Sequence, residues 1–260
     1  MSFNTLLLTE EDAVATITLN RPEKRNAISY ELIDELLRAL GEVERYSAQV
    51  LVITGAGPAF CSGMDLDNLR NITSRSEADN LKDSETMARL FRSIYEFPKP
   101  TIAAVNGPAL AGGCGIATLC DFTIAAENAK FGYTEVRIGF IPAIVSSFLI
   151  MQVGEKIARD LLLTGRVIEA SEAKRLGLVN DTVPPDNLMQ WCTDLATTLK
   201  HNSPASLVAT KKLLASFLRP ELDRNIEMAI RENARIRTTQ DFREGVTSFL
   251  EKRKPHWTGK

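Results

Sequence analysis

Glu135 is the residue whose sequence surroundings best suit proton transfer. It lies in residues 131–142, a strongly apolar stretch in which burial would raise the pKa of its carboxyl group toward the range useful for an acid and base. Arg137 could instead pair with Glu135 and hold it ionised. A lone glutamate is more often a solvated surface residue, so any chemistry depends on the groups placed beside it.

Two glycine-containing turns could supply hydrogen-bond donors to the same site. Residues 60–66 and 109–115 each follow a short apolar run, and glycine permits their backbone N–H groups to approach a ligand closely. Residues 116–120 favour a helix whose N-terminus would add free donors. Two converging N–H groups would form an oxyanion hole for an enolate or thioester oxygen. Either turn alone could equally serve only to pack a helix on a sheet.

Short apolar runs predict the strands that must position these turns. Residues 14–19 alternate and are β-branched, whereas residues 50–54, 101–105 and 122–126 are continuous runs of the kind found in buried strands. Ser29 can begin an amphipathic helix after the first strand.

Helical patterns fill the intervals and the end of the chain. Residues 77–97 are one such pattern, so strands and helices alternate as they do in layered α/β folds. After about residue 143 the strands are expected to stop and the chain to be almost wholly helical. The last helices, residues 221–252, carry many charges and a narrow apolar stripe, which favours packing on a neighbouring surface or subunit.

The composition is that of a globular protein without a strong electrostatic field. Of the 260 residues, 44% are hydrophobic and 31 Lys and Arg face 33 Asp and Glu, so a net charge of −2 gathers neither nucleic acid nor an anionic membrane. Two histidines disfavour a histidine-based triad or zinc site. Four cysteines without a CxxC pair indicate a reducing, cytoplasmic setting. The N-terminus lacks a signal-peptide pattern, and no stretch is long enough to cross a bilayer.

Several motifs, taken in order, resemble one family across essentially the whole chain. In the order and spacing of these motifs, the sequence resembles the crotonase superfamily, that is, the enoyl-CoA hydratase/isomerase family. The motifs are residues 20–27, 60–66, 100–107, 112–114, 120–121 and 131–132, followed by residues 163–165, 173–179, Lys211 and residues 249–255.

The resemblance implies a fold, a substrate and an assembly. The fold would be α/β, a crotonase-like spiral of repeated ββα units in residues 1–200, with a C-terminal helical trimerisation region in residues 201–260. The substrate would be an acyl-CoA thioester, with no metal and no redox cofactor, since coenzyme A is part of the substrate. The assembly would be a homotrimer or a dimer of trimers.

Matched residue by residue, the resemblance also assigns roles. The oxyanion-hole donors fall on the backbone N–H groups of Met64 and Gly112, and the second of the two hydratase glutamates falls on Glu135. The first glutamate falls on Gly115, where the acid is absent. Other residues are expected to line the substrate pocket or to meet the phosphates of CoA. The pocket residues are Gly63, Asp65, Leu66, Gly113, Gly115, Tyr133 and Ile144, and the CoA residues are Lys24 and Arg25, with Lys252, Arg253 and Lys254 as further basic candidates.

A single acid suits a 1,3-proton shift better than water addition. One carboxylate can take the α-proton of a 3-enoyl thioester and return it at the γ-carbon, whereas two-acid hydratases hold the water between both carboxylates. The sequence therefore favours enoyl-CoA double-bond isomerisation by Glu135.

Several alternatives to this isomerase remain open. A hydratase, of enoyl-CoA or of 3-methylglutaconyl type, could recruit Asp65, Asp67 or Glu85, although one of the two aspartates is expected to cap a helix and the other to be solvated. A glycine at Gly115 also resembles the naphthoyl-CoA synthases, where bicarbonate replaces the carboxylate, but those typically carry aspartate at the second site. A non-catalytic acyl-CoA-binding paralogue is the remaining alternative. Cys114 is expected to pack as a small buried residue rather than to act as a nucleophile.

Overall fold

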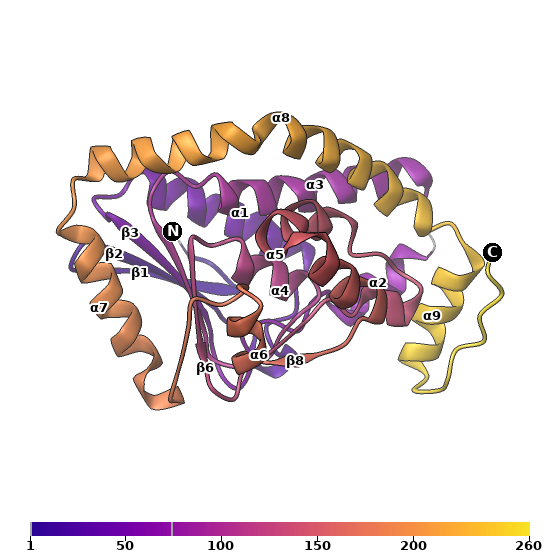
Figure 1. The fold of residues 1–260 in the computed structure, drawn as a ribbon. Coiled ribbons are helices and arrows are strands. Elements are labelled where there is room, and N and C mark those ends of the chain that lie inside the picture. The colour runs from indigo at the N-terminus through magenta and orange to yellow at the C-terminus, as the bar shows by residue number, and fades with distance from the viewer. Residues whose placement is uncertain (1, 74) are drawn as a thin grey trace.

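The computed structural model describes residues 2–73 and 75–260, and it contains two sheets surrounded by helices (Figure 1). The larger sheet has the strand order β1-β2-β3-β4-β6-β9. Strands β1 and β2 pair antiparallel, and every later pair in this sheet is parallel. Its strands are β1 (Leu6–Glu11), β2 (Val14–Leu19), β3 (Val50–Gly55), β4 (Thr101–Val105), β6 (Phe122–Ala126) and β9 (Asp181–Val183). The smaller sheet has the order β5-β7-β8, with β5 (Ala109–Leu110), β7 (Lys130–Gly132) and β8 (Ile168–Glu169).

The continuous apolar runs of the larger sheet are buried on both faces. In β3, Val50 and Val52 pack in one core cluster while Leu51 and Ile53 pack in the other. Strands β4 and β6 alternate between the two clusters in the same way. Because neither face meets water, no polar alternation is needed, which confirms the interpretation of these runs as buried strands.

Helices cover the two faces of this sheet. Helix α7 (Leu188–Lys200) closes one face with Leu188, Cys192, Ala196 and Leu199. The other face carries α1 (Tyr30–Arg45), α3 (Glu77–Tyr95) and α4 (Gly112–Thr118). Ser29 is the N-cap of α1, where its hydroxyl accepts a 3.1 Å hydrogen bond from the Leu32 N–H, as the sequence predicts.

The C-terminal half is mostly helical. Helix α5 (Ala143–Thr164) is interrupted at Gly154, α6 spans Ala170–Arg175, and α8 (Pro204–Ile236) runs beside α3 along one edge of the molecule (Figure 1). Helix α9 (Gln240–Leu250) follows α8 and contacts α2 (Leu66–Ile72). Three short 3₁₀ helices complete the described elements: η1 (Pro22–Lys24), η2 (Glu135–Ile138) and η3 (Pro185–Asn187).

Two expectations from the sequence, one about this half and one about α4, are wrong in detail. Strands do not stop near residue 143, since β8 pairs with β7 and β9 pairs with β6. These strands have two and three residues, too few for an alternating pattern to appear in the sequence. The turn helix also begins at Gly112 rather than Ile116. Among the helices of the described residues, none has the length and apolar character needed to cross a membrane.

Candidate active site

A cavity of about 410 Å³ lies where the two glycine turns meet η2. Its remaining walls come from α3, α5 and the ends of α8 and α9. Most of the lining is apolar, and of the described residues that line it Glu135 alone carries a carboxylate. The two glycine turns and the start of η2 contribute these lining residues: Ser62, Met64, Leu110, Ala111, Gly112, Thr134 and Glu135.

The first turn, residues 60–66, presents the Met64 N–H to this cavity. The neighbouring backbone groups are already bonded, because the Ile28 N–H donates to the Gly63 carbonyl (2.7 Å) and the Asp65 N–H donates to the Ile28 carbonyl (3.0 Å). Gly63 has a φ of +90°, a conformation that glycine adopts without strain. Within residues 2–73 and 75–260 the Met64 N–H donates no hydrogen bond, so a ligand oxygen could accept it.

The second turn presents the Gly112 N–H in a similar way. Ala111 has φ 50° and ψ −127°, a strained backbone conformation for a residue with a Cβ atom, and its N–H donates to the Gly132 carbonyl (2.7 Å). This geometry places Gly112 as the first residue of α4, where N–H groups lack helical partners. In the described part of the chain the Gly112 N–H donates no hydrogen bond.

The two turns are held directly against each other. The Cys61 N–H donates to the Pro108 carbonyl (3.1 Å), and the Leu110 N–H donates to the Cys61 carbonyl (2.9 Å). A Cβ atom at Gly113 would lie 2.4 Å from the Cys61 carbonyl oxygen, so this contact requires glycine. The two free N–H groups are therefore fixed on one wall of the cavity.

Glu135 begins η2 and is buried beside these donors. Its side chain lines the cavity, the residue is 8% exposed, and its Oε2 atom has no hydrogen-bond partner among the described residues. Burial raises the pKa of Glu135 from the ordinary 4.5 to about 7, opposed in part by its own backbone N–H. Arg137 is exposed and forms no ion pair in the described structure, so it does not hold Glu135 ionised as the sequence allowed.

Helix α9 fixes the position of η2. A Cβ atom at Gly245 would lie 2.2 Å from the Ile138 carbonyl oxygen, and one at Gly139 would lie 2.4 Å from the Asp241 carbonyl oxygen. Gly139 also has a φ of +66°. The backbone of α9 therefore approaches that of η2 as closely as glycine allows, and this contact supports the segment that carries Glu135.

Gly115 lies behind two residues that line the cavity and offers no room for a second acid. A Cβ atom at Gly115 would lie 2.7 Å from Val145 Cγ1 and 3.2 Å from Phe91 Cζ. Both neighbours are buried and line the cavity. Apolar side chains therefore occupy the place of the missing carboxylate.

The acids proposed as replacements are outside the cavity. Asp65 caps α2 by accepting from the Asp67 N–H (2.9 Å) and pairs with Arg21 (2.8 Å). Asp67 is exposed and pairs with Lys24 (3.1 Å). Glu85 is exposed on α3. The prediction of one capping and one solvated aspartate is thus confirmed, and none of the three acids lines the cavity.

The structure places the predicted pocket residues in two groups. Met64, Gly112, Glu135 and Ile144 line the cavity together. The others do not line it: Asp65 is the buried N-cap of α2 and Leu66 is 46% exposed, and the remaining residues are Gly63, Gly113, Gly115 and Tyr133.

Tyr133 and Cys114 both lie in the core behind the cavity. Tyr133 is 1% exposed and its hydroxyl lies 3.1 Å from Thr118 Oγ1, so it packs below the site instead of lining it. Burial raises the pKa of the Cys114 thiol to about 12, which fits a packing residue and disfavours a nucleophile.

The predicted CoA residues do not line the cavity, but their loop contacts a residue that does. Lys24 and Arg25 are exposed, and the Arg25 carbonyl accepts a 3.1 Å hydrogen bond from the Ser62 N–H. Their loop is therefore joined to the first turn. Their role in binding phosphate stays a prediction.

Sequence reasoning missed the polar residues that α8 contributes. Asn233 and Arg237 line the cavity although they are about one hundred positions from Glu135. Their sequence surroundings resemble any charged helix, so no local signal identifies them. Throughout residues 2–73 and 75–260, no group of three or more His, Cys, Asp or Glu side chains is arranged to hold a metal ion.

Comparison with known proteins gives a consistent set of similarities. A family profile described as enoyl-CoA hydratase/isomerase matches residues 9–260. A Thermus thermophilus protein provisionally named enoyl-CoA hydratase is 45% identical over 249 residues, 95% of this chain and 98% of that protein. The 2,3-dehydroadipyl-CoA hydratase of Escherichia coli is 35% identical over 257 residues, 98% of this chain and 99% of the relative. A crystal structure of an enoyl-CoA hydratase/isomerase from Xanthobacter autotrophicus Py2 has a TM-score of 0.89 at 31% identity and covers 96% of this chain and 97% of its own.

Proposed function

Because the chain belongs to the enoyl-CoA hydratase/isomerase family and is an acyl-CoA enzyme, we propose that it shifts the double bond of an enoyl-CoA thioester with Glu135 as its single acid and base. The predicted crotonase-like α/β fold with a helical C-terminal region is confirmed by the structural similarities. The observation that carries the proposal is that Glu135 is the one carboxylate among the described residues of the cavity, and that Val145 and Phe91 fill the space beside Gly115.

The proposed reaction begins with the thioester oxygen at the two free N–H groups. The ionised carboxylate of Glu135 removes a proton from the α-carbon of a 3-enoyl thioester, and the negative charge spreads to the thioester oxygen as a dienolate. Hydrogen bonds from the Met64 and Gly112 N–H groups stabilise that charge. Glu135 then returns the proton to the γ-carbon, which yields the 2-enoyl thioester with unchanged mass.

The surroundings of Glu135 support a two-way proton transfer. A pKa of about 7 means that the carboxylate can gain and lose a proton near neutral pH at little cost in either direction. The mostly apolar lining excludes competing water and strengthens the electrostatic effect of the two N–H groups.

A second candidate is water addition to a 2-enoyl thioester, and the names of the relatives favour it. Hydration would need a group besides Glu135 to hold or activate the water. Besides Glu135, the described polar residues that line the cavity are Ser62, Thr134, Arg137, Asn233 and Arg237, and none of them carries a carboxyl group. This difference is the reason that isomerisation is the first proposal.

Incubation in oxygen-labelled water separates the two candidates, because only hydration transfers a water oxygen atom to the product. The purified protein is given a short 2-enoyl-CoA and, separately, a 3-enoyl-CoA, and the products are examined by mass spectrometry and chromatography. A double-bond shift at unchanged mass with the 3-enoyl thioester is expected. Gain of one labelled water by the 2-enoyl thioester at a comparable rate would overturn the isomerase assignment, and turnover of neither substrate would contradict the proposal altogether.

Further features of the enzyme belong to the same proposal. No metal or redox cofactor is needed for a proton shift, and the exposed Lys24 and Arg25 are available to meet the phosphates of CoA. The reduced thiol content favours a cytoplasmic location, since all four cysteines are free.

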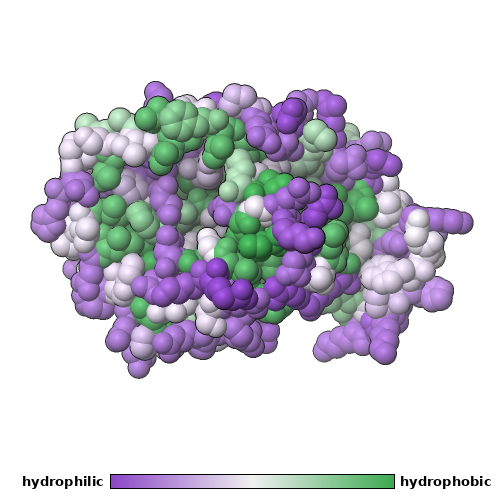
Figure 2. Space-filling model, in the orientation of Figure 1, coloured by the Kyte–Doolittle hydropathy of each residue, from purple (hydrophilic) through white to green (hydrophobic). Residues whose placement is uncertain are grey.

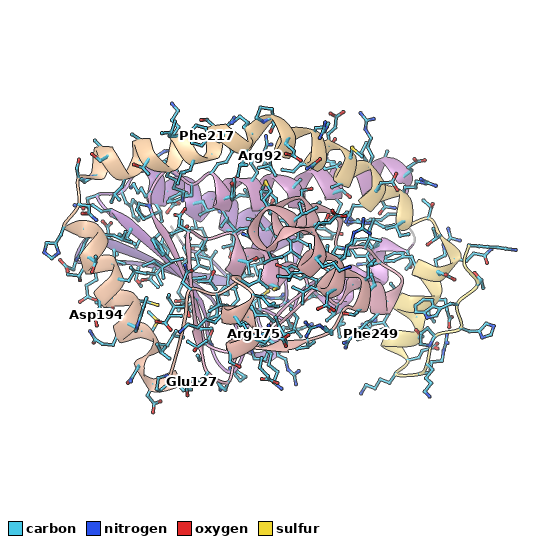
Figure 3. All side chains as sticks on the ribbon, in the orientation of Figure 1. Arg92, Glu127, Arg175, Asp194, Phe217 and Phe249 are labelled. Carbon is cyan, nitrogen blue, oxygen red and sulfur yellow. The ribbon has the colours of Figure 1, made fainter. Side chains whose placement is uncertain are left out.

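We also propose that the chain assembles as a homotrimer or a dimer of trimers. Large apolar side chains are exposed along α8, including Leu213, Leu214 and Phe217, which are 54%, 59% and 68% exposed. Figure 2 shows hydrophobic residues gathered over the part of α8 on which Figure 3 labels Phe217. Exposed apolar area of this kind supports burial against further copies of the chain.

A further inference from the structure

The cavity contains a second charged group far from Glu135 in the sequence. Arg237, at the end of α8, lines the cavity, and its side chain is 2% exposed. Its guanidinium group donates to Asp83 on α3 and to Asn233 Oδ1 at 2.7 Å. A proton shift at Glu135 makes no use of this cluster, so its position on the cavity wall needs another explanation.

The cluster has spare hydrogen-bond donors among the described residues. Arg237 Nε is buried without a hydrogen-bond partner. Asn233 Oδ1 accepts from Arg237 Nη2 and lies 2.8 Å from Ser84 Oγ, whose single proton is shared with the Asn80 carbonyl. In the part of the chain that the structure describes, the Asn233 amide nitrogen donates to no acceptor. A group that only accepts hydrogen bonds would satisfy both donors.

The cluster also has an excess of positive charge. Asp83 lies between Arg237 and Arg75, whose Nη1 atom is 3.8 Å from Asp83 Oδ1, so one anion faces two cations. The ring of Phe140 covers Arg237 at 5.3 Å, and the ring of Tyr30 covers Arg75 at 4.4 Å. Arg237 and Asp83 are buried while Arg75 is 30% exposed, and positive charge at a partly desolvated site attracts an anion more strongly than it would in water.

We propose that Arg237 and Asn233 select acyl-CoA substrates whose acyl chain ends in a carboxylate. The inference rests on the proposed function, because it takes the thioester to lie at the Met64 and Gly112 N–H groups. A carboxylate is an anion and only accepts hydrogen bonds, so it matches both the excess charge and the free donors. The terminal carboxylate would then lie at α8 while the reacting carbons lie at Glu135.

The test compares saturated acyl-CoA thioesters that differ only at the end of the acyl chain. Succinyl-, glutaryl- and adipoyl-CoA are paired with butanoyl-, pentanoyl- and hexanoyl-CoA, and dissociation constants are measured by calorimetry. The chain length that spans from the thioester to Arg237 should bind about tenfold or more tightly with the carboxylate than without it. No preference at any of the three lengths would overturn the proposal. Because both members of a pair contain CoA, attraction of its phosphates cancels in the ratio.

Isosteric variants connect any preference to this cluster. Asn233→Asp keeps the Oδ1 acceptor for Arg237 but replaces the free donor by an anion, so the ratio of the two dissociation constants should fall to about one. Arg237→Gln combined with Asp83→Asn should do the same without leaving a buried charge unpaired. Arg137→Gln, which removes an exposed arginine that also lines the cavity, is the matched control and should keep the ratio. If the preference for the carboxylate persists in Asn233→Asp and in the double variant, residues other than Arg237 and Asn233 cause it, and the proposal is wrong.

This experiment separates the inference from the proposed reaction. The ligands are saturated and unreactive, so binding is measured whether or not the protein shifts a double bond. A clear carboxylate preference together with no turnover of any enoyl-CoA would uphold the inference and contradict the reaction. Turnover of an enoyl-CoA without any preference for a terminal carboxylate would support the reaction and contradict the inference.

Discussion

The Cγ1 atom of Val145 lies 2.7 Å from the position that a Cβ atom at Gly115 would take. Real Cβ atoms essentially never show contacts this short, so a side chain at Gly115 would force the Val145 side chain, or the helix that carries it, to shift. The place that the family resemblance assigns to the first hydratase glutamate is therefore filled by hydrocarbon from α5.

Gly115→Glu alone is expected to destabilise the protein without creating a hydratase. The new carboxylate would meet Val145 and Phe91 in an apolar setting, which should cost roughly 2 kcal/mol or more of unfolding free energy. Combining it with Val145→Ala makes room and should raise the ratio of water addition to double-bond shift. Val145→Ala by itself is the control. Hydration by the single Gly115→Glu variant at undiminished stability would contradict this account.

Turnover is expected to rise with pH around the pKa of Glu135. The base must be ionised to take the α-proton, and burial places that pKa at about 7. The rate should therefore increase between about pH 6 and pH 8 and then level off. Glu135→Gln should lower kcat by about a thousandfold or more while saturated acyl-CoA still binds. Glu85→Gln is the control, because Glu85 is exposed outside the cavity. A flat pH profile in the native enzyme would remove Glu135 from the role of base.

The same carboxyl group should make stability depend on pH. The folded-state pKa of Glu135 is raised, so the folded protein favours the protonated form, and this contribution is fully present below about pH 4.5 and is lost as pH rises through about 7. Glutamine does not ionise, so Glu135→Gln should not lose stability as the pH rises through about 7. The variant should be more stable than the native protein by up to about 3 kcal/mol above pH 7, and should show no such gain below pH 4.5. Denaturant unfolding at both pH values measures the difference, and an equal difference at both would contradict it.

The sequence predicts the scaffold of the site better than its contents. Continuous apolar runs identify β3, β4 and β6 because both faces of that sheet are buried. The family motifs predict a shared site for Met64, Gly112 and Glu135, and all three residues line one cavity.

The rest depends on contacts between segments that are distant in the chain. Val145 fills the space beside Gly115 from α5, and Arg237 reaches the cavity from α8, so neither position can be recognised from its own neighbours in sequence. Tyr133 shows the opposite error, because an aromatic residue two positions from Glu135 lies beneath the site rather than in it. Proximity in the sequence does not determine which side of a turn a side chain takes.

Two glycine-to-alanine variants should change the stability of the protein in opposite directions. Gly113→Ala would place a Cβ atom 2.4 Å from the Cys61 carbonyl oxygen, and should separate the two turns and lower both stability and turnover. Gly41→Ala, in α1, would meet nothing within 4 Å and should stabilise the helix by about 0.5–1 kcal/mol. Melting temperature and activity are compared for both variants. Equal tolerance of alanine at Gly113 would contradict the close contact that aligns the Met64 and Gly112 N–H groups.

A charged residue at Phe217 is expected to disrupt self-association. Phe217 is 68% exposed on α8 beside other exposed apolar residues, and burial of such a surface between copies would be opposed by a carboxylate. Phe217→Glu should therefore lower the mass measured by light scattering from that of an oligomer, with the melting temperature of the fold itself little changed. Arg231→Glu, at an exposed polar position farther along the same helix, is the control for added negative charge. A native protein that is monomeric at micromolar concentration, or a Phe217→Glu variant that remains fully assembled, would show that this part of α8 does not join the copies.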